Sequence, residues 1–188
     1  GIFEKMNFLQ QKNPASIGSK QVNNKNLNCE KQENTSSSVA ASSSAASSPL
    51  VFYINGEQHT VENPDPSMSL NDYIRRQPSL TGVKKCCGEA GCGVCTVMLT
   101  TSDGKKSSTV SCNSCVRPLC SMAGTNVTTV EGIGSTQNGL SDVQQEFVAS
   151  NASQCGFCSD GWIVQMTSLL ANNPNPTVQD IDKILDQN

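Results

Sequence analysis

The stretch Cys87-Gly-Glu-Ala-Gly-Cys92-Gly-Val-Cys95 decides how the rest of the sequence is interpreted. Its cysteines follow C-x4-C-x2-C, the spacing of plant-type [2Fe–2S] ligation, in which a fourth thiolate lies further along the chain. Four thiolates must converge on two irons, so the backbone has to wrap around them. Glycine allows the positive φ angles and close N–H···S approaches that this wrapping needs. The interleaved glycines are Gly88, Gly91 and Gly93, and the spacing leaves the fourth ligand open among Cys112, Cys115 and Cys120.

A structural zinc site is the main alternative. The set Cys92, Cys95, Cys112 and Cys115 has the spacing of a zinc ribbon. Such a site would be closed and tetrahedral, and the chain would then be a zinc-stabilised interaction module. Two features favour the iron–sulfur interpretation. The zinc pattern gives Cys87 no role, and zinc does not require glycines packed between its ligands.

A second cysteine motif, Cys155-Gly-Phe-Cys158, lies at the start of a predicted helix. It could be a thioredoxin-like dithiol, because a helix N-terminus lowers the pKa of a thiol. That interpretation expects a strand directly before the motif, whereas helix and loop residues precede it here. As half of a second cluster site, the motif needs two further thiolates.

Composition limits the remaining classes of function. The chain has 188 residues, enough for one ordinary domain or two small ones, and its formal net charge is −3. This charge gives no support to nucleic-acid binding, and no stretch approaches the roughly 18 to 20 apolar residues of a membrane span. No signal peptide opens the chain, so ten cysteines without an oxidising compartment are expected to be metal ligands or redox groups, in a cytoplasmic protein.

The chain divides into three predicted segments. Residues 1–49 are Ser- and Asn-rich and are expected to form a disordered extension. Residues 50–134 predict a small β-rich unit, and residues 135–188 predict helices. The β-rich unit is expected to contain a hairpin over 51–61 with an Asn55-Gly56 turn, a short helix capped by Ser69, and strands at 96–99, 109–110 and 127–130, with a turn at Asp103-Gly104.

The predicted helices follow apolar stripes. The central one contains Trp162, Ile163, Met166, Leu169 and Leu170 at helical spacing. Thr177 and Asp180 resemble a capping box before a last helix.

Several motifs in the same order resemble the N-terminal iron–sulfur region of the molybdenum hydroxylases, the xanthine dehydrogenase and aldehyde oxidase family. They are Cys86-Cys-Gly-Glu-Ala-Gly-Cys-Gly-Val-Cys-Thr-Val-Met98, Asn113-Ser-Cys115-Val-Arg-Pro-Leu-Cys120 and Ser153-Gln-Cys-Gly-Phe-Cys158. The resemblance covers residues 51–188. It implies an α+β chain in which a plant-ferredoxin-like β-grasp domain precedes a truncated all-α [2Fe–2S]-binding domain.

The resemblance also implies roles for individual residues. It assigns Cys115 as the fourth ligand beside Cys87, Cys92 and Cys95, and it leaves Cys112 and Cys120 as buried thiols. Cys155 and Cys158 would be half of a second cluster site, and Gln154 would contact the pterin. Electrons would pass from a molybdenum–pterin site through the clusters to FAD. Those two groups would be bound by other domains of the same parent chain and not by this chain alone. The resemblance also implies that the parent is a homodimer.

Departures from the family pattern lead to further expectations. Ala90 replaces a glycine, so it needs either a negative φ or some backbone strain. Asp160 adds a carboxylate near the second site, which would lower the potential there. The family continues into a C-R-C pair after the position of Asn188, and the first residue here is Gly1, which suggests a piece cut at both ends. We therefore expect one complete cluster site and a second that does not assemble in this chain.

Overall fold

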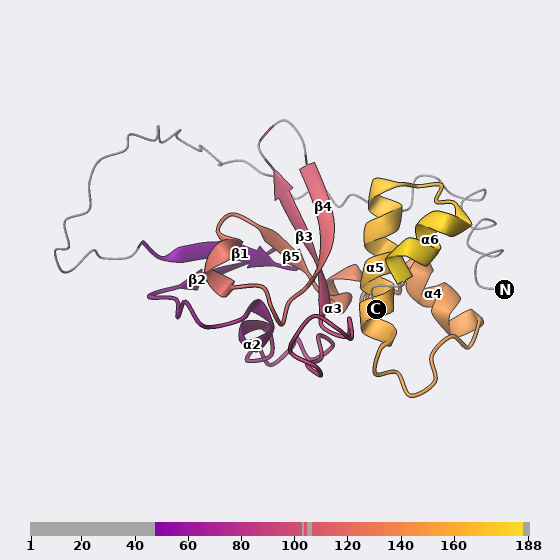
Figure 1. Cartoon of the computed structure of the whole chain (residues 1–188), viewed down its shortest axis with the longest axis horizontal. Coiled ribbons are helices and arrows are strands. Elements are labelled where there is room, and N and C mark those ends of the chain that lie inside the picture. The colour runs from indigo at the N-terminus through magenta and orange to yellow at the C-terminus, as the bar shows by residue number, and fades with distance from the viewer. Residues whose placement is uncertain (1–47, 103, 105–106, 186–188) are drawn as a thin grey trace.

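A computed structural model describes residues 48–102, 104 and 107–185 (Figure 1). The predicted extension over 1–49 lies almost wholly outside these residues, as does Asp103 of the predicted turn. The predicted hairpin is confirmed: β1 (Leu50–Ile54) pairs antiparallel with β2 (Glu57–Val61). Asn55 and Gly56 between them have φ of 53° and 84°, and the two positive values match a type I′ turn.

The five strands form one mixed sheet in the order β2-β1-β5-β3-β4. The remaining members are β3 (Thr96–Ser102), β4 (Ser107–Asn113) and β5 (Asn126–Thr128). β5 lies parallel to β1 and antiparallel to β3, so a strand late in the sequence fills the middle of the sheet. β4 is longer than the two-residue strand predicted there, and its pairing with β3 positions the candidate ligands described below.

The predicted strand over 127–130 ends early. β5 stops at Thr128, and Val130 already begins the short helix α3 (Val130–Ile133). The cause is Asn55, whose Oδ1 accepts a hydrogen bond from the Thr129 N–H at 2.9 Å and whose Nδ2 donates to Thr129 Oγ1 at 2.9 Å. Thr129 is therefore bound to the hairpin turn and does not continue the strand.

The sheet and the short helix α2 (Leu70–Ile74) enclose the first core. Ser69 caps α2 as predicted, because its Oγ accepts from the Asp72 N–H at 3.1 Å. Two candidate ligands, Cys95 and Cys115, belong to this core. The fully buried apolar side chains of the core are Phe52, Leu70, Ile74, Val97, Leu119, Met122 and Val127.

Three longer helices form the second half: α4 (Asp142–Ala149), α5 (Ser159–Asn172) and α6 (Val178–Leu185). α5 is the central one, and it packs against β3, β4 and α6. The second core consists of Val130, Phe147, Ile163, Val164 and Met166.

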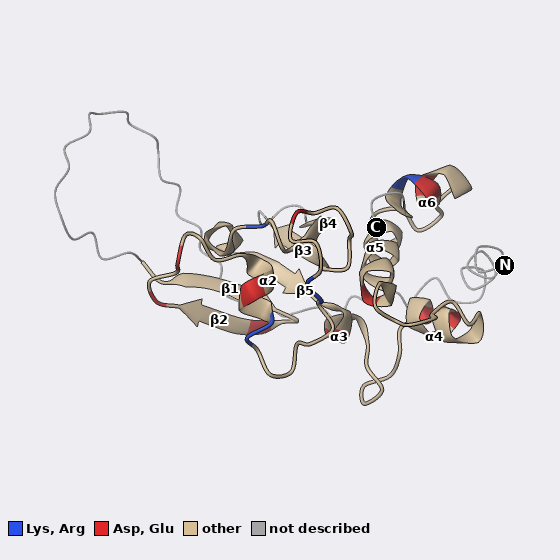
Figure 2. Cartoon of the chain, turned by 60° about the horizontal axis from the view of Figure 1, so that its bottom comes forward, with Lys and Arg blue, Asp and Glu red and all other residues tan. Residues whose placement is uncertain are grey.

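Each of four helices has an aspartate in its first turn, namely Asp72, Asp142, Asp160 and Asp180 (Figure 2). Negative charge at this end stabilises a helix, because the free N–H groups there carry partial positive charge. The predicted Thr177–Asp180 capping box is confirmed, with Asp180 N–H donating to Thr177 Oγ1 at 3.2 Å and Thr177 N–H donating to Asp180 Oδ2 at 3.0 Å. Within the described ranges, none of the helices has the length and apolar content of a membrane span.

Candidate metal centre

The loop between α2 and β3 bends around the side chain of Cys87. The backbone N–H groups of Glu89 and Gly91 donate to Cys87 Sγ at 3.4 and 3.3 Å. Gly88 and Gly93 have φ of 76° and 67°, whereas Gly91 is not in the left-handed region. Gly88 and Gly93 therefore adopt the left-handed conformation, which residues with a Cβ disfavour. Gly91 contributes its N–H to the Cys87 sulfur.

Ala90 is in the left-handed region, with φ of 62°. Of the two alternatives that the sequence allowed, the structure has the strained one. The loop keeps its shape because the Ala90 carbonyl accepts a hydrogen bond from Asn113 Nδ2 at 3.1 Å. Asn113 lies at the end of β4, so this contact attaches the loop to the sheet.

Cys95 and Cys115 approach each other through the pairing of β3 with β4. Thr96 is the cross-strand partner of Asn113, so the chain segments just outside these two residues lie together. Ser114 fixes them, because both its N–H and its Oγ donate to the Cys95 carbonyl, at 3.2 and 2.6 Å. Cys95 is 2% exposed and Cys115 is 9% exposed.

The other two candidates for the fourth ligand lie elsewhere. Cys112 is the cross-strand partner of Val97 and packs, partly buried, against the first core. Cys120 is exposed, so its predicted burial is wrong. Cys120 lies in the short 3-10 helix η1 (Leu119–Met122), in which Leu119 and Met122 are the buried residues. Successive residues of such a turn point in different directions, so Cys120 faces solvent although Leu119 does not.

The electrostatics of the thiols reflect their positions. Hydrogen bonds from the Glu89 N–H and from the Cys92 thiol lower the pKa of Cys87 to about 7. Burial raises the pKa of Cys95 to about 11, and Cys115 is its hydrogen-bonding neighbour. The charge of Cys92 raises the pKa of Cys86, which is exposed beside the first ligand.

Two pairs of candidate thiols are hydrogen-bonding neighbours, Cys87 with Cys92 and Cys95 with Cys115. Over the part of the chain that the structure describes, no three His, Cys, Asp or Glu side chains converge closely enough to hold a single metal ion. The donor chemistry nevertheless fits an iron–sulfur cluster, since all four donors are thiols and backbone N–H groups point at a sulfur.

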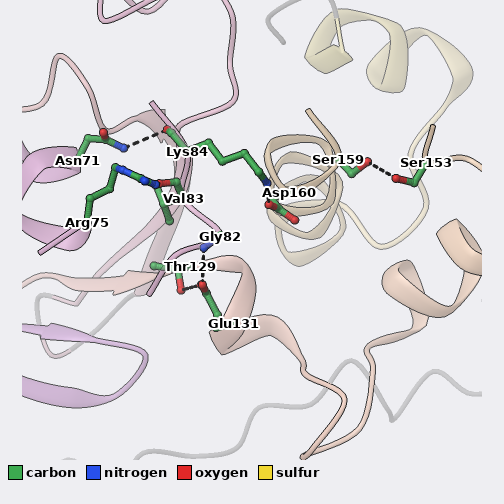
Figure 3. Close-up of polar contacts among 10 residues, drawn as sticks. All are labelled: Asn71, Arg75, Gly82, Val83, Lys84, Thr129, Glu131, Ser153, Ser159 and Asp160. Atoms are coloured by element: carbon green, nitrogen blue, oxygen red, sulfur yellow. Dashed lines mark hydrogen bonds and ion pairs between the residues drawn. The ribbon is translucent and has the colours of Figure 1, made fainter. Parts of the chain in front are cut away.

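Asn71 is a further residue of this site, which sequence reasoning missed. It is fully buried, and its Nδ2 donates to the Lys84 carbonyl at 3.3 Å (Figure 3). The same Nδ2 donates to Ser114 Oγ at 3.1 Å. Asn71 therefore joins the chain before the Cys87 loop to the residue that holds Cys95 and Cys115. Its Oδ1 is buried without a hydrogen-bond partner. The sequence offered one signal for this role: Asn71 is a polar residue directly after Leu70, at the start of a short helix that is otherwise expected to bury apolar side chains.

The second motif is more open. Cys155 and Cys158 are exposed, Cys158 is the residue preceding α5 as predicted, and Gly156 has φ of 81°. Gln154 is exposed in the same loop. The loop is closed by a 2.8 Å hydrogen bond between the hydroxyls of Ser153 and Ser159 (Figure 3).

Two family descriptions match the chain. The 2Fe-2S iron-sulfur cluster binding domain matches residues 52–120, and the [2Fe-2S] binding domain matches residues 129–188. The first match contains Cys87, Cys92, Cys95 and Cys115, and the second contains Cys155 and Cys158. No comparison supports the zinc alternative.

Relatives with assigned names agree with these matches. The xanthine dehydrogenase/oxidase of Felis catus is 47% identical over 135 residues, 71% of this chain and 10% of that protein. Aldehyde oxidase 4 of Cavia porcellus is 40% identical over 144 residues, 76% of this chain and 11% of that protein. The chain thus spans about a tenth of the length of these relatives.

Solved structures show the same relationship. A chain of quinoline 2-oxidoreductase from Pseudomonas putida 86 has a TM-score of 0.62 and 31% identity, over 77% of this chain and 83% of that one. The aldehyde oxidoreductase of Desulfovibrio desulfuricans has a TM-score of 0.64 and 34% identity, over 74% of this chain and 14% of that one. Because sequence, structure and both cysteine motifs agree, the chain belongs to the molybdenum hydroxylase family and corresponds to the iron–sulfur region of those oxidoreductases.

Proposed function

We propose that this chain carries electrons through a [2Fe–2S] cluster held by Cys87, Cys92, Cys95 and Cys115. The observation that carries the proposal is the meeting of Cys95 and Cys115 at the end of the β3–β4 pair, beside a loop whose N–H groups point at Cys87 Sγ. The fold of residues 50–134 that goes with this role is a β-grasp of the plant-ferredoxin type.

The residues of the chain would hold and tune the cluster. When bound, the cluster supplies reversible one-electron chemistry at a potential that depends on hydrogen bonds to sulfur and on solvent exposure. Glu89 and Gly91 donate N–H groups that stabilise negative charge on Cys87. The buried Cys95 and Cys115 would exclude water from the opposite side. Both effects would help to set the potential.

The wider role of the chain extends this proposal. Residues 135–188 would form a helical domain in which Cys155 and Cys158 are two ligands of a second [2Fe–2S] cluster. In the parent enzyme, electrons would pass from a molybdenum–pterin site through both clusters towards FAD. Gln154 would contact the pterin, and its exposure in the Cys155–Cys158 loop leaves its side chain available for this.

Anaerobic reconstitution of the whole chain with iron and sulfide tests the proposal. We expect a red-brown protein with about two irons and an equal amount of sulfide per chain, bleached by dithionite. A colourless protein that binds one zinc ion through Cys92, Cys95, Cys112 and Cys115 would contradict the proposal, because that product defines the zinc module.

A further inference from the structure

The loops of the two candidate cluster sites are joined by an ion pair. Lys84 Nζ contacts Asp160 Oδ2, and the side chains of the two residues are 26% and 25% exposed (Figure 3). Lys84 precedes Cys87 by three residues, and Asp160 follows Cys158 by two. The Lys84 side chain, which comes from the part of the chain that contains the sheet (residues 50–134), therefore contacts α5, the helix that follows the second cysteine motif.

The backbone on the Lys84 side of this pair is fixed. The Lys84 carbonyl accepts from the buried Asn71, and the Val83 carbonyl accepts from Arg75 Nη1 at 2.9 Å. The Gly82 N–H donates to Glu131 Oε1 at 2.7 Å. The backbone of residues 82–84 is thus hydrogen-bonded to side chains from α2, from its C-terminal end and from α3 (Figure 3). These bonds fix the backbone from which the Lys84 side chain extends to α5.

Lys84 also contacts the cysteine loop of the second site itself. Its Nζ lies 5.9 Å from the ring centroid of Phe157, within the range of a cation–π interaction. Phe157 lies between Cys155 and Cys158 in the sequence, and it is 45% exposed. The ammonium group therefore has two partners in the second site, one directly before Cys158 and one two residues after it.

We propose that Lys84 is an interdomain positioning residue, which holds the Cys155–Cys158 loop against the first cluster site and so fixes the separation of the two. The meaning for electron transfer rests on the proposed function, since transfer between two centres requires a short and constant separation. The pairing also offsets the negative charge of Asp160. Asp160 should therefore lower the potential of the second site less than its charge alone would suggest.

An exposed ion pair between mobile side chains would have little effect on the structure. Three observations distinguish this pair: both side chains are about three-quarters covered, the carbonyls of Lys84 and of the preceding residue are hydrogen-bonded, and the ammonium has a second partner in Phe157. The neighbouring Lys85 provides a contrast. It pairs with Asp72 inside the sheet half, with exposures of 42% and 40%.

Hydrogen–deuterium exchange on the whole chain tests the inference, because it needs no bound cluster. Lys84→Gln should speed amide exchange in peptides covering residues 153–162 by about two- to fivefold, the range expected when one such contact is lost. Lys85→Gln removes the same charge one residue away and should leave these peptides unchanged. Equal effects of the two variants, or no effect of Lys84→Gln, would overturn the inference.

A double-mutant cycle separates a direct contact from a general loss of stability. Asp160→Asn also removes negative charge from the first turn of α5, so its effect is measured in both backgrounds. It should speed exchange in the wild-type chain and should speed it less in the Lys84→Gln chain, where the ion pair is already lost. Additive effects of the two changes would overturn the inference. Failure of the wild-type chain to bind a cluster would instead refute the proposed function and leave these exchange results standing.

Discussion

Cys115 meets Cys95 because β3 and β4 pair Thr96 with Asn113, and the chain turns back towards β3 directly after that pair. Cys112, three residues earlier, is still inside β4 and packs against the core. The strand register therefore distinguishes two cysteines that the spacing of the sequence leaves equivalent.

This difference predicts opposite results for two conservative changes. Cys115→Ser should abolish the visible absorption of the reconstituted chain, because it removes a thiolate that the cluster requires. Cys112→Ser should keep both the absorption and the iron content, and it is the matched control. Loss of the cluster in Cys112→Ser with retention in Cys115→Ser would show that the assignment of the fourth ligand is wrong.

Asn71→Ala should lower the free energy of unfolding by about 2–3 kcal/mol, because it removes the donor of one fully buried and one part-buried hydrogen bond. The affected groups are the Lys84 carbonyl and Ser114 Oγ. Urea denaturation of the cluster-free chain measures this change. Asn138→Ala, on an exposed loop, should stay within about 0.5 kcal/mol of the wild type. A similar value for the two variants would remove Asn71 from the site.

Ala90→Gly should raise the free energy of unfolding by about 0.5–1 kcal/mol. The relief of the left-handed strain at φ of 62° exceeds the entropic cost of adding a glycine. Gly91→Ala is the matched control, since its φ is outside that region and a new Cβ would meet no atom within 4 Å. It should be neutral or slightly stabilising. Destabilisation by Ala90→Gly would mean that the loop relaxes without strain.

The start of α6 should loosen in acid. Hydrogen bonds from the N–H and the hydroxyl of Thr177 hold the pKa of Asp180 below its ordinary value of 3.8. A lowered carboxyl pKa adds stability that is complete above pH 3.8 and is lost as the pH falls through the folded value. Proton NMR of the α6 amides should show this loss below about pH 4, weakened in Thr177→Ala. Asp182→Asn, on the exposed face of the same helix, should not alter it.

Local signals in the sequence predicted local structure well. The Asn55-Gly56 turn, the Ser69 cap, the Thr177 capping box and the start of α5 at Cys158 each depend on a few adjacent residues, and the structure confirms them. The capping box of α4, between Ser141 and Gln144, has the same pattern and could have been found in the same way.

What the sequence could not reveal depends on contacts between distant residues. The end of β5 is set by Asn55, which lies 74 residues from Thr129. The role of Asn71 depends on Ser114, 43 residues away, and the partner of Asp160 lies 76 residues earlier. A single sequence gives no measure of such proximity, so nothing in it marks Asn71 or Asp160 as a residue with a distant partner.

Asn55 links two parts of the molecule that the sequence presents as separate. Hairpin geometry alone would also allow Gly-Gly in this turn. That change would remove both hydrogen bonds that the Asn55 side chain makes with the fully buried Thr129 and would leave the Thr129 N–H without this acceptor. Gly132 is constrained from the other direction, because a methyl group there would come within 2.1 Å of the Asn55 amide oxygen. The tip of the first hairpin therefore fixes where the chain leaves β5 and enters α3, and a side chain larger than glycine at position 132 would require a smaller residue at position 55.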